Sequence, residues 1–145
     1  MRELEEVKFE EVLACCQREN AESKTLPWTV SQLNSNGAGR WKLVMLSRED
    51  ILKIVLPQHH RCGVKLIPEG GLTVSAAAAT VRATTGETGE CWNNIAFQKG
   101  RDFSQTHIFL KTENGGLSHL DGLHRLLAWA LFDKQVELHA YVVQL

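Results

Sequence analysis

The residues best suited to chemistry fall in one short run, His119-Leu120-Asp121-Gly122-Leu123-His124-Arg125. A strand is expected before this run and a helix after it, with Gly122 making the turn between them. Because side chains alternate along a strand, His119 and Asp121 are expected on the same face. The first turn of a helix presents unpaired N–H groups and the positive end of the helix dipole, which suit phosphate. The run therefore predicts an anion site.

Each polar side chain of this run has a chemical role that it could fill. The guanidinium of Arg125 can bind two phosphate oxygens at once, with His124 beside it in the first helical turn. Asp121 can hold Mg²⁺ or orient a hydroxyl nucleophile, and His119 is the second candidate base. The structural alternative is that Asp121 caps the helix, Gly122 only makes the turn and Arg125 forms an ion pair. Spacing alone leaves both interpretations open.

The elements that must position this run follow from the hydrophobic spacing around it. A strand over 107–111, an Asn-Gly turn over 112–116 and a return strand over 117–121 lead into it. Apolar residues at 123, 126, 127, 130 and 131 form one face of a helix. The alternation from 136 to 143 then indicates a half-buried strand. The predicted order is hairpin, helix, strand.

The first half of the chain predicts further elements. A helix over roughly residues 3–19 is expected, because apolar residues from Phe9 to Cys16 share one helical face and glutamates crowd its first turns. Strands over 28–33 and 41–46 are expected to form a hairpin through the turn-forming residues between them. Ser47-Arg48-Glu49-Asp50 resembles a capping box, which predicts a short helix from about 48 to 56.

The middle of the chain is less clearly patterned. Residues 63–67 fit a short strand, 72–84 fit a helix or a strand equally well, and 86–89 fit an exposed loop. No internal repeat or linker divides the chain. The sequence therefore predicts one α+β domain over residues 1–145, with a small mixed sheet packed with helices.

Composition excludes several classes of protein. Sixteen basic and seventeen acidic residues give a net charge of −1, so binding of DNA through bulk phosphate attraction is not expected. No stretch approaches the roughly 18 apolar residues of a membrane span, and the acidic N-terminus does not resemble a signal peptide. The four cysteines lack CxxC spacing and are expected to be buried free thiols. A cytoplasmic protein with no membrane partner is predicted.

Three further groups are weaker candidates. His59-His60-Arg61-Cys62 could bind a metal, but adjacent histidines point in different directions, which favours a polar loop. Cys91 is a candidate nucleophile, for which a buried thiol is the simpler interpretation. Lys99 and Arg101 could reach the phosphates expected at Arg125, or lie in an ordinary solvated turn.

The segment from Leu120 to Ala128 resembles the signature of the ParB/sulfiredoxin-like superfamily. Members of that superfamily carry a motif of the form D/G-G-x-H-R-x-x-A at the start of a helix that binds nucleotide phosphates. The resemblance covers about residues 105–143. It implies that Gly122, His124 and Arg125 contact the phosphates of ATP or CTP, with Mg²⁺ nearby.

The sequence departs from the superfamily pattern, and these departures argue against two of the superfamily's activities. Leu123 stands where sulfiredoxin has its catalytic cysteine, so reduction of a sulfinic acid is not expected. The partitioning proteins have an acidic residue after the glycine, whereas here Asp121 precedes it, and their basic helix-turn-helix region has no counterpart. DNA partitioning is therefore not expected. The motif is closer to that of the ParB-like small-molecule kinases and of unassigned ParB-like domains.

The leading prediction is thus a nucleotide-binding enzyme, a Mg²⁺-dependent phosphotransferase or NTP hydrolase that acts on a small metabolite. Its catalytic candidates are Asp121, His119 and His124. In one alternative, an enzyme without nucleotide uses Arg125 to clamp a carboxylate while His119, Asp121 or His124 moves a proton. In another, the fold is a non-enzymatic binding module. Whether the chain forms a homo-oligomer is left open.

Overall fold

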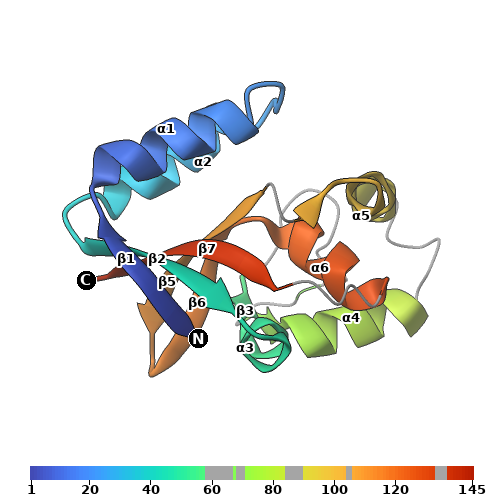
Figure 1. Ribbon diagram of the computed structural model, residues 1–145. Helices are drawn as coiled ribbons and strands as arrows, with labels where there is room; N and C mark the ends of the chain where they lie inside the picture. Colours follow the sequence, from blue (N-terminus) through green and yellow to red (C-terminus); the bar gives the residue numbers. More distant parts are fainter. Residues whose placement is uncertain (58–66, 68–70, 84–89, 104–105, 133–136) are drawn as a thin grey trace.

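The computed structural model describes residues 1–57, 67, 71–83, 90–103, 106–132 and 137–145, which form a mixed α+β fold (Figure 1). This confirms the predicted fold class. Along the chain the elements are β1 (Arg2–Val7), α1 (Phe9–Glu19), α2 (Leu26–Ser35), β2 (Arg40–Leu46), α3 (Arg48–Lys53), β3 (Val55–Leu56), β4 (Leu72–Thr73), α4 (Val74–Ala83), α5 (Glu90–Lys99), β5 (His107–Glu113), β6 (Gly116–Asp121), α6 (Leu123–Leu131) and β7 (Leu138–Gln144).

The strands form one mixed sheet in the order β1-β2-β7-β5-β6-β3-β4. Strand β7 pairs antiparallel with β2 and parallel with β5, and β5 and β6 form an antiparallel hairpin. Asn114 and Gly115 both have positive φ, at 52° and 78°, which is the backbone pattern of a type I′ hairpin turn. The predicted order of hairpin, helix and strand in the last forty residues is therefore confirmed.

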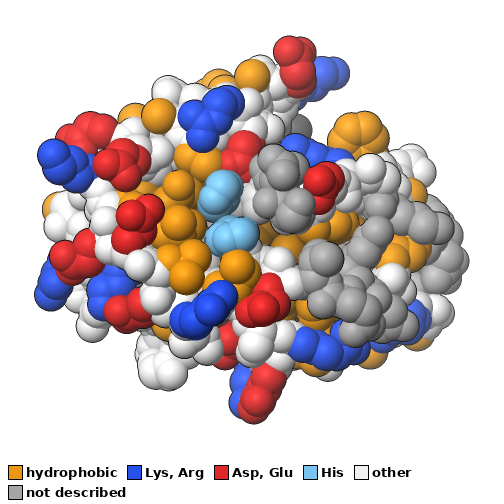
Figure 2. Space-filling view, in the orientation of Figure 1, with side chains coloured by type: hydrophobic (Ala, Val, Ile, Leu, Met, Phe, Trp, Pro, Cys, Tyr) orange, Lys and Arg blue, Asp and Glu red, His pale blue; other side chains and the backbone are white. Residues whose placement is uncertain are grey.

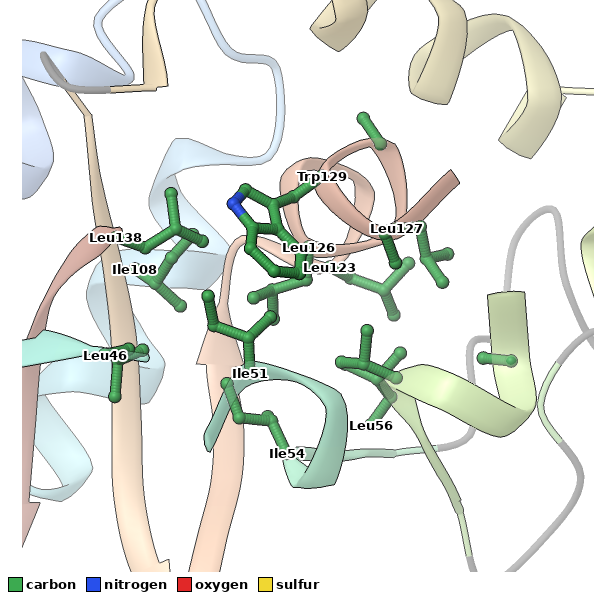
Figure 3. Close-up of a cluster of buried hydrophobic side chains, with 14 of the residues drawn as sticks. Leu46, Ile51, Ile54, Leu56, Ile108, Leu123, Leu126, Leu127, Trp129 and Leu138 are labelled. Atoms are coloured by element: carbon green, nitrogen blue, oxygen red, sulfur yellow. The ribbon is translucent and has the colours of Figure 1, made fainter. Parts of the chain in front are cut away.

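Helices cover both faces of the sheet, and each face has its own hydrophobic cluster (Figure 1). Figure 3 shows the larger cluster, in which α6 contributes Trp129, α3 contributes Ile51, Ile54 follows the end of α3, and the sheet contributes Leu46 and Leu138. The second cluster joins α1 and α2 to the opposite face of the sheet through Val12, Cys16, Leu33, Trp41 and Phe109. Because side chains alternate between the two faces along the central strands, these strands contribute residues to both clusters.

The predicted helix over residues 3–19 begins later than expected, at Phe9, because residues 2–7 form the edge strand β1. This strand pairs antiparallel with β2. Glu3 accepts a hydrogen bond from Lys42 at 2.8 Å, and Glu6 pairs with Arg40. The glutamates therefore face lysine and arginine across the sheet, an arrangement that competes with the helix-dipole interaction assumed from the sequence.

The predicted strand over 28–33, and with it the predicted hairpin, is wrong, because these residues belong to helix α2. Pro27 lies in the first turn of this helix, where its missing N–H costs nothing. Thr29 and Leu33 lie one helical turn apart and are both buried, whereas Trp28 is 57% exposed. The apolar residues thus follow a helical period that short-range alternation concealed.

The remaining local predictions are largely confirmed. Strand β2 covers the predicted 41–46, and Ser47 and Asp50 form the capping box at the start of α3. Helix α3 ends at Lys53, earlier than predicted, because the chain joins the sheet as β3. The ambiguous segment 72–84 is mainly the helix α4. The expected strand over 63–67 and loop over 86–89 lie outside the described residues, apart from the buried Ile67.

None of the helices in the described part of the chain is long and apolar enough to cross a membrane.

Gly122 makes the turn between β6 and α6 with a φ of 109°, and a Cβ built there would lie 2.7 Å from Cδ1 of Ile108. We expect Gly122→Ala to lower the free energy of unfolding by about 2–4 kcal/mol, since it combines backbone strain with overpacking. Gly115→Ala is the matched control, because Gly115 also has positive φ but has nothing within 4 Å of its Cβ position. It should cost about 1 kcal/mol. Equal losses in urea unfolding would contradict the role of the Ile108 contact.

Candidate functional site

Arg125 lies in the first turn of α6 and is 3% exposed. Its Nη2 donates to Oδ2 of Asp121 at 3.0 Å, and its Nη1 donates to the backbone carbonyl of His107 at 2.8 Å. The same Nη1 lies 4.0 Å from Oε1 of Glu19. The guanidinium therefore connects α6 with β6, β5 and α1, and it donates to two groups of the protein itself.

Asp121 completes this pair from the end of β6. Its Oδ1 accepts a hydrogen bond from the Thr29 hydroxyl at 3.4 Å. Burial raises the pKa of Asp121, while the charge of Arg125 and the bond from Thr29 act in the opposite direction. Gly122, not Asp121, is the N-cap of α6, and no side chain caps that helix. Of the structural alternatives, the ion pair is thus present and the Asp121 cap is not.

His119 and Asp121 do not share a face, contrary to the prediction. The β5–β6 pairing shifts register between Phe109 and Leu110, so that Phe109 lies opposite Asp121 while Leu110 lies opposite His119. Cross-strand partners share a face, and neighbouring residues on β5 point to opposite faces. The extra residue, Leu120, is a β-bulge that breaks the alternation. His119 therefore lies on the α6 side of the sheet, and Asp121 lies on the α1 and α2 side.

A polar cluster that the sequence did not indicate lies where α1 meets the start of β5. It consists of Cys15, Glu19 and His107, and we call it the Cys15–Glu19–His107 cluster. Oε2 of Glu19 is 2.5 Å from Sγ of Cys15 and 2.8 Å from Nδ1 of His107. Oε1 of Glu19 accepts the backbone N–H of His107 at 2.6 Å. One carboxylate thus holds a thiol, an imidazole and a strand end together.

The protonation states in the cluster follow from these contacts. Burial raises the pKa of Glu19, but hydrogen bonds from His107 and Cys15 outweigh it, so the net pKa is lowered and the carboxylate is ionised. Burial and the neighbouring Glu19 raise the pKa of Cys15 to about 12, so the thiol is protonated and donates. Because an ionised carboxylate only accepts, Nδ1 of His107 carries a hydrogen in this arrangement. This leaves Nε2 of His107 outside the contact with Glu19.

Strand β7 places two more side chains beside His107. The His107 ring stacks on Tyr141, with ring centroids 5.0 Å apart, and lies 5.8 Å from the ring of His139. Both histidines are half-buried, and Figure 2 shows histidine side chains grouped near the centre of one face with hydrophobic side chains beside them. Burial, followed by the charge of His107, lowers the pKa of His139. At neutral pH the imidazole of His139 is therefore uncharged.

The remaining candidates from the sequence are His124, Arg101, Lys99, Cys91 and residues 59–62. His124 is half-buried in the first turn of α6. Arg101 is half-buried and donates to Oε1 of Gln98 at 3.4 Å. Burial and then the charge of Arg125 lower the pKa of Arg101. Residues 59–62 and the side chains of Cys91 and Lys99 lie outside the described residues.

The cluster escaped sequence reasoning because its members are far apart along the chain. His107 follows Cys15 by 92 residues and Glu19 by 88. The only local signal was the spacing of Cys15 and Glu19, one helical turn apart and therefore on one face of α1. Nothing near His107 in the sequence indicates a partner on the first helix.

The fold and this site define an α+β protein with a buried polar network where α1, β5 and α6 meet. The whole chain, residues 1–145, matches the model described as Family of unknown function (DUF6309), and the protein belongs to that family. No curated protein and no solved structure matches the chain.

Arg125→Met should lower the free energy of unfolding by about 3–5 kcal/mol, because it leaves Asp121 and Glu19 buried without their cation. Arg40→Met is the matched control, because Arg40 pairs with Glu6 on the surface, and it should cost less than about 1 kcal/mol. Urea unfolding of both variants measures the difference. Near-equal stabilities would show that the Arg125 network does not hold the fold together.

Cys15 and Cys16 should resist alkylation in the folded protein. Both are buried, and burial is the largest cause of their raised pKa values. The pKa is about 12 for Cys15 and about 11 for Cys16. In a Cys62→Ser/Cys91→Ser chain treated with EDTA at pH 8, we expect iodoacetamide to react about a hundredfold more slowly than in urea. Mass spectrometry of the time course checks this, and equal rates would contradict the placement of both thiols.

Proposed function

We propose that this protein is a small-molecule enzyme that works without a nucleotide and moves a proton through His107 and Glu19. The observation that carries the proposal is the 2.8 Å contact between Nδ1 of His107 and the Glu19 carboxylate. A carboxylate that accepts the Nδ1 hydrogen fixes both the orientation and the tautomer of the ring. The other ring nitrogen, Nε2, is then the atom that takes up or delivers a proton.

The surroundings of this pair support the proposal because they hold it in place. Arg125 donates to the carbonyl of His107 and lies beside Glu19, and its own position is set by Asp121. The side chain of Glu19 is 10% exposed and that of His107 is 23% exposed, so the carboxylate is shielded while the ring reaches the surface. A base oriented by a shielded partner on rigid elements is what proton transfer requires.

This proposal keeps the reaction class of the nucleotide-independent alternative but changes the residues. In the sequence-based hypothesis Arg125 clamps a substrate carboxylate, and His119, Asp121 or His124 moves the proton. Here Arg125 is a positioning residue that acts through Glu19 and His107. His139, whose ring lies next to that of His107, is the second imidazole available to a bound substrate.

A nucleotide-dependent phosphotransferase or NTP hydrolase, with ATP or CTP and Mg²⁺ as the ParB/sulfiredoxin-like resemblance implies, is the second candidate. It is favoured by Arg101, a second arginine whose pKa is lowered by burial and then by the charge of Arg125. Arginines suit the binding of a phosphate group. Two donors of Arg125 are, however, already bound to Asp121 and to the carbonyl of His107, so the geometry favours the acid–base proposal.

Thermal unfolding in the presence of candidate ligands separates the two functions. The ligands are ATP and CTP with Mg²⁺, and a panel of small carboxylated and hydroxylated metabolites. We expect a metabolite, and neither nucleotide, to raise the melting temperature by several degrees, since ligand at a hundredfold excess over its Kd adds about 2.7 kcal/mol. A nucleotide-dependent shift that is lost in Arg101→Ala would instead support the second candidate.

Turnover of a stabilising metabolite, followed by NMR, then tests the role of His107. We expect His107→Gln to lower turnover by about 10²–10⁴-fold, because glutamine fills a similar space but transfers no proton. His124→Gln is the matched control and should retain turnover, since His124 lies outside the cluster. Unchanged turnover in His107→Gln would contradict the proposal.

A further inference from the structure

We propose that Cys15, Glu19 and His107 bind a transition metal ion of the zinc class, with one ligand atom from each side chain. The inference goes beyond the proposed function, because it uses the same cluster but has the ion take the place of the Nδ1 hydrogen of His107 that Glu19 accepts in that proposal. It adds a cofactor that neither the sequence motif nor the family assignment indicates.

The three ligand atoms already lie close enough together to share one ion. Sγ of Cys15, a carboxylate oxygen of Glu19 and Nδ1 of His107 all lie within 4.8 Å of one another. Sγ and Nδ1 are 3.4 Å apart, and a tetrahedral zinc shell separates such ligands by about 3.4–3.6 Å. The two contacts of Glu19 Oε2, at 2.5 and 2.8 Å, are hydrogen-bond lengths. If an ion took the place of the thiol and imidazole hydrogens, the Glu19 carboxylate would have to move away from the other two ligands by about 1 Å.

The ligand types select the kind of ion. A thiolate, an imidazole and a carboxylate suit zinc and its neighbours in the transition series, whereas Mg²⁺ prefers oxygen ligands only. The Mg²⁺ ion expected at Asp121 is a different case, because both oxygens of Asp121 already accept hydrogen bonds from Thr29 and Arg125. The chemistry of the cluster therefore points away from magnesium.

Groups around the cluster already orient its ligands. Cys15 and Glu19 lie on successive turns of the rigid helix α1. The second carboxylate oxygen, Oε1 of Glu19, accepts the backbone N–H of His107 and lies 4.0 Å from Nη1 of Arg125. Metal sites commonly depend on such outer contacts to hold their ligands in one geometry. The Arg125 network would serve the ion in this way without touching it.

Three protein ligands leave one coordination position open, which is the pattern of catalytic rather than structural zinc sites. Cys15 is 3% exposed and the His107 side chain is 23% exposed, so the cluster is closed at the thiol and open toward the histidine. The ring of His139 lies 5.8 Å from that of His107. A bound ion would polarise a carbonyl group or activate a water molecule at the open position.

Titration of the protein with Co²⁺, Zn²⁺ and Mg²⁺ after removal of metals by EDTA tests the site. The Cys62→Ser/Cys91→Ser chain is used, so that only Cys15 and Cys16 can supply a thiolate. We expect one Co²⁺ per chain, with the visible absorption of a tetrahedral ion and a sulfur-to-cobalt charge-transfer band, both lost when Zn²⁺ is added. Mg²⁺ should not displace Co²⁺. Absence of the sulfur-to-cobalt band would overturn the proposal.

Matched variants assign the ligands. Cys15→Ser and His107→Gln should each weaken Zn²⁺ binding by more than about 100-fold. Cys16→Ala, at the adjacent buried thiol, and His124→Gln should leave Zn²⁺ affinity nearly unchanged. Glu19→Gln is the second variant if circular dichroism shows that Cys15→Ser does not fold. Equal loss of affinity in Cys16→Ala and Cys15→Ser would overturn the assignment.

The metal site and the proposed enzyme fail in different ways. If the metal-free chain turns over a metabolite and binds no Zn²⁺, the metal proposal is overturned and the acid–base enzyme stands. If Zn²⁺ binds with the expected losses but no metabolite is turned over, the metal site stands and the proposed function fails.

Discussion

The buried guanidinium of Arg125 is the interaction on which the arrangement of the whole site depends. A cation with 3% exposure is costly to remove from water unless anions and carbonyl groups surround it. Asp121 on β6, the carbonyl of His107 on β5 and Glu19 on α1 provide those groups. The apolar face of α6 lies in one hydrophobic cluster, whereas α1 lies against the other face of the sheet. Arg125 therefore links the two layers, and the position of Glu19 follows from that link.

Because of this network, the Asp-Gly-Leu-His-Arg motif has a structural role in the fold. A phosphate site and a buried ion pair both need an arginine, an acidic residue and a glycine turn at the start of a helix. Here the arginine and the acid satisfy each other, and Gly122 allows the close approach to Ile108. The charged groups of the motif contact the neighbouring cluster on α1 and β5, which holds a half-buried histidine and a buried thiol.

Predictions succeeded where the signal was local. The β5–β6 hairpin, α6 and β7 were predicted because a positive-φ turn and regular apolar spacing leave few alternatives. The capping box at Ser47 is a signal of the same kind. Predictions failed at β1 and α2, where strand pairing with β2 and burial of Thr29 and Leu33 outweighed the apparent pattern. Asp121 and Arg125 lie together as their spacing suggested, but His119 lies on the other face of the sheet.

The sequence by itself determined the fold class, the strand-to-helix turn at Gly122 and the closeness of Asp121 and Arg125, because each depends on residues within a few positions of one another. Only the tertiary structure decided which partners those charges have, and that Cys15 and Glu19 meet His107 across about ninety residues. It also decided, through the bulge at Leu120, which face His119 occupies. The physical reason is that burying the two faces of the sheet brings distant segments together, and no local periodicity records which segments meet.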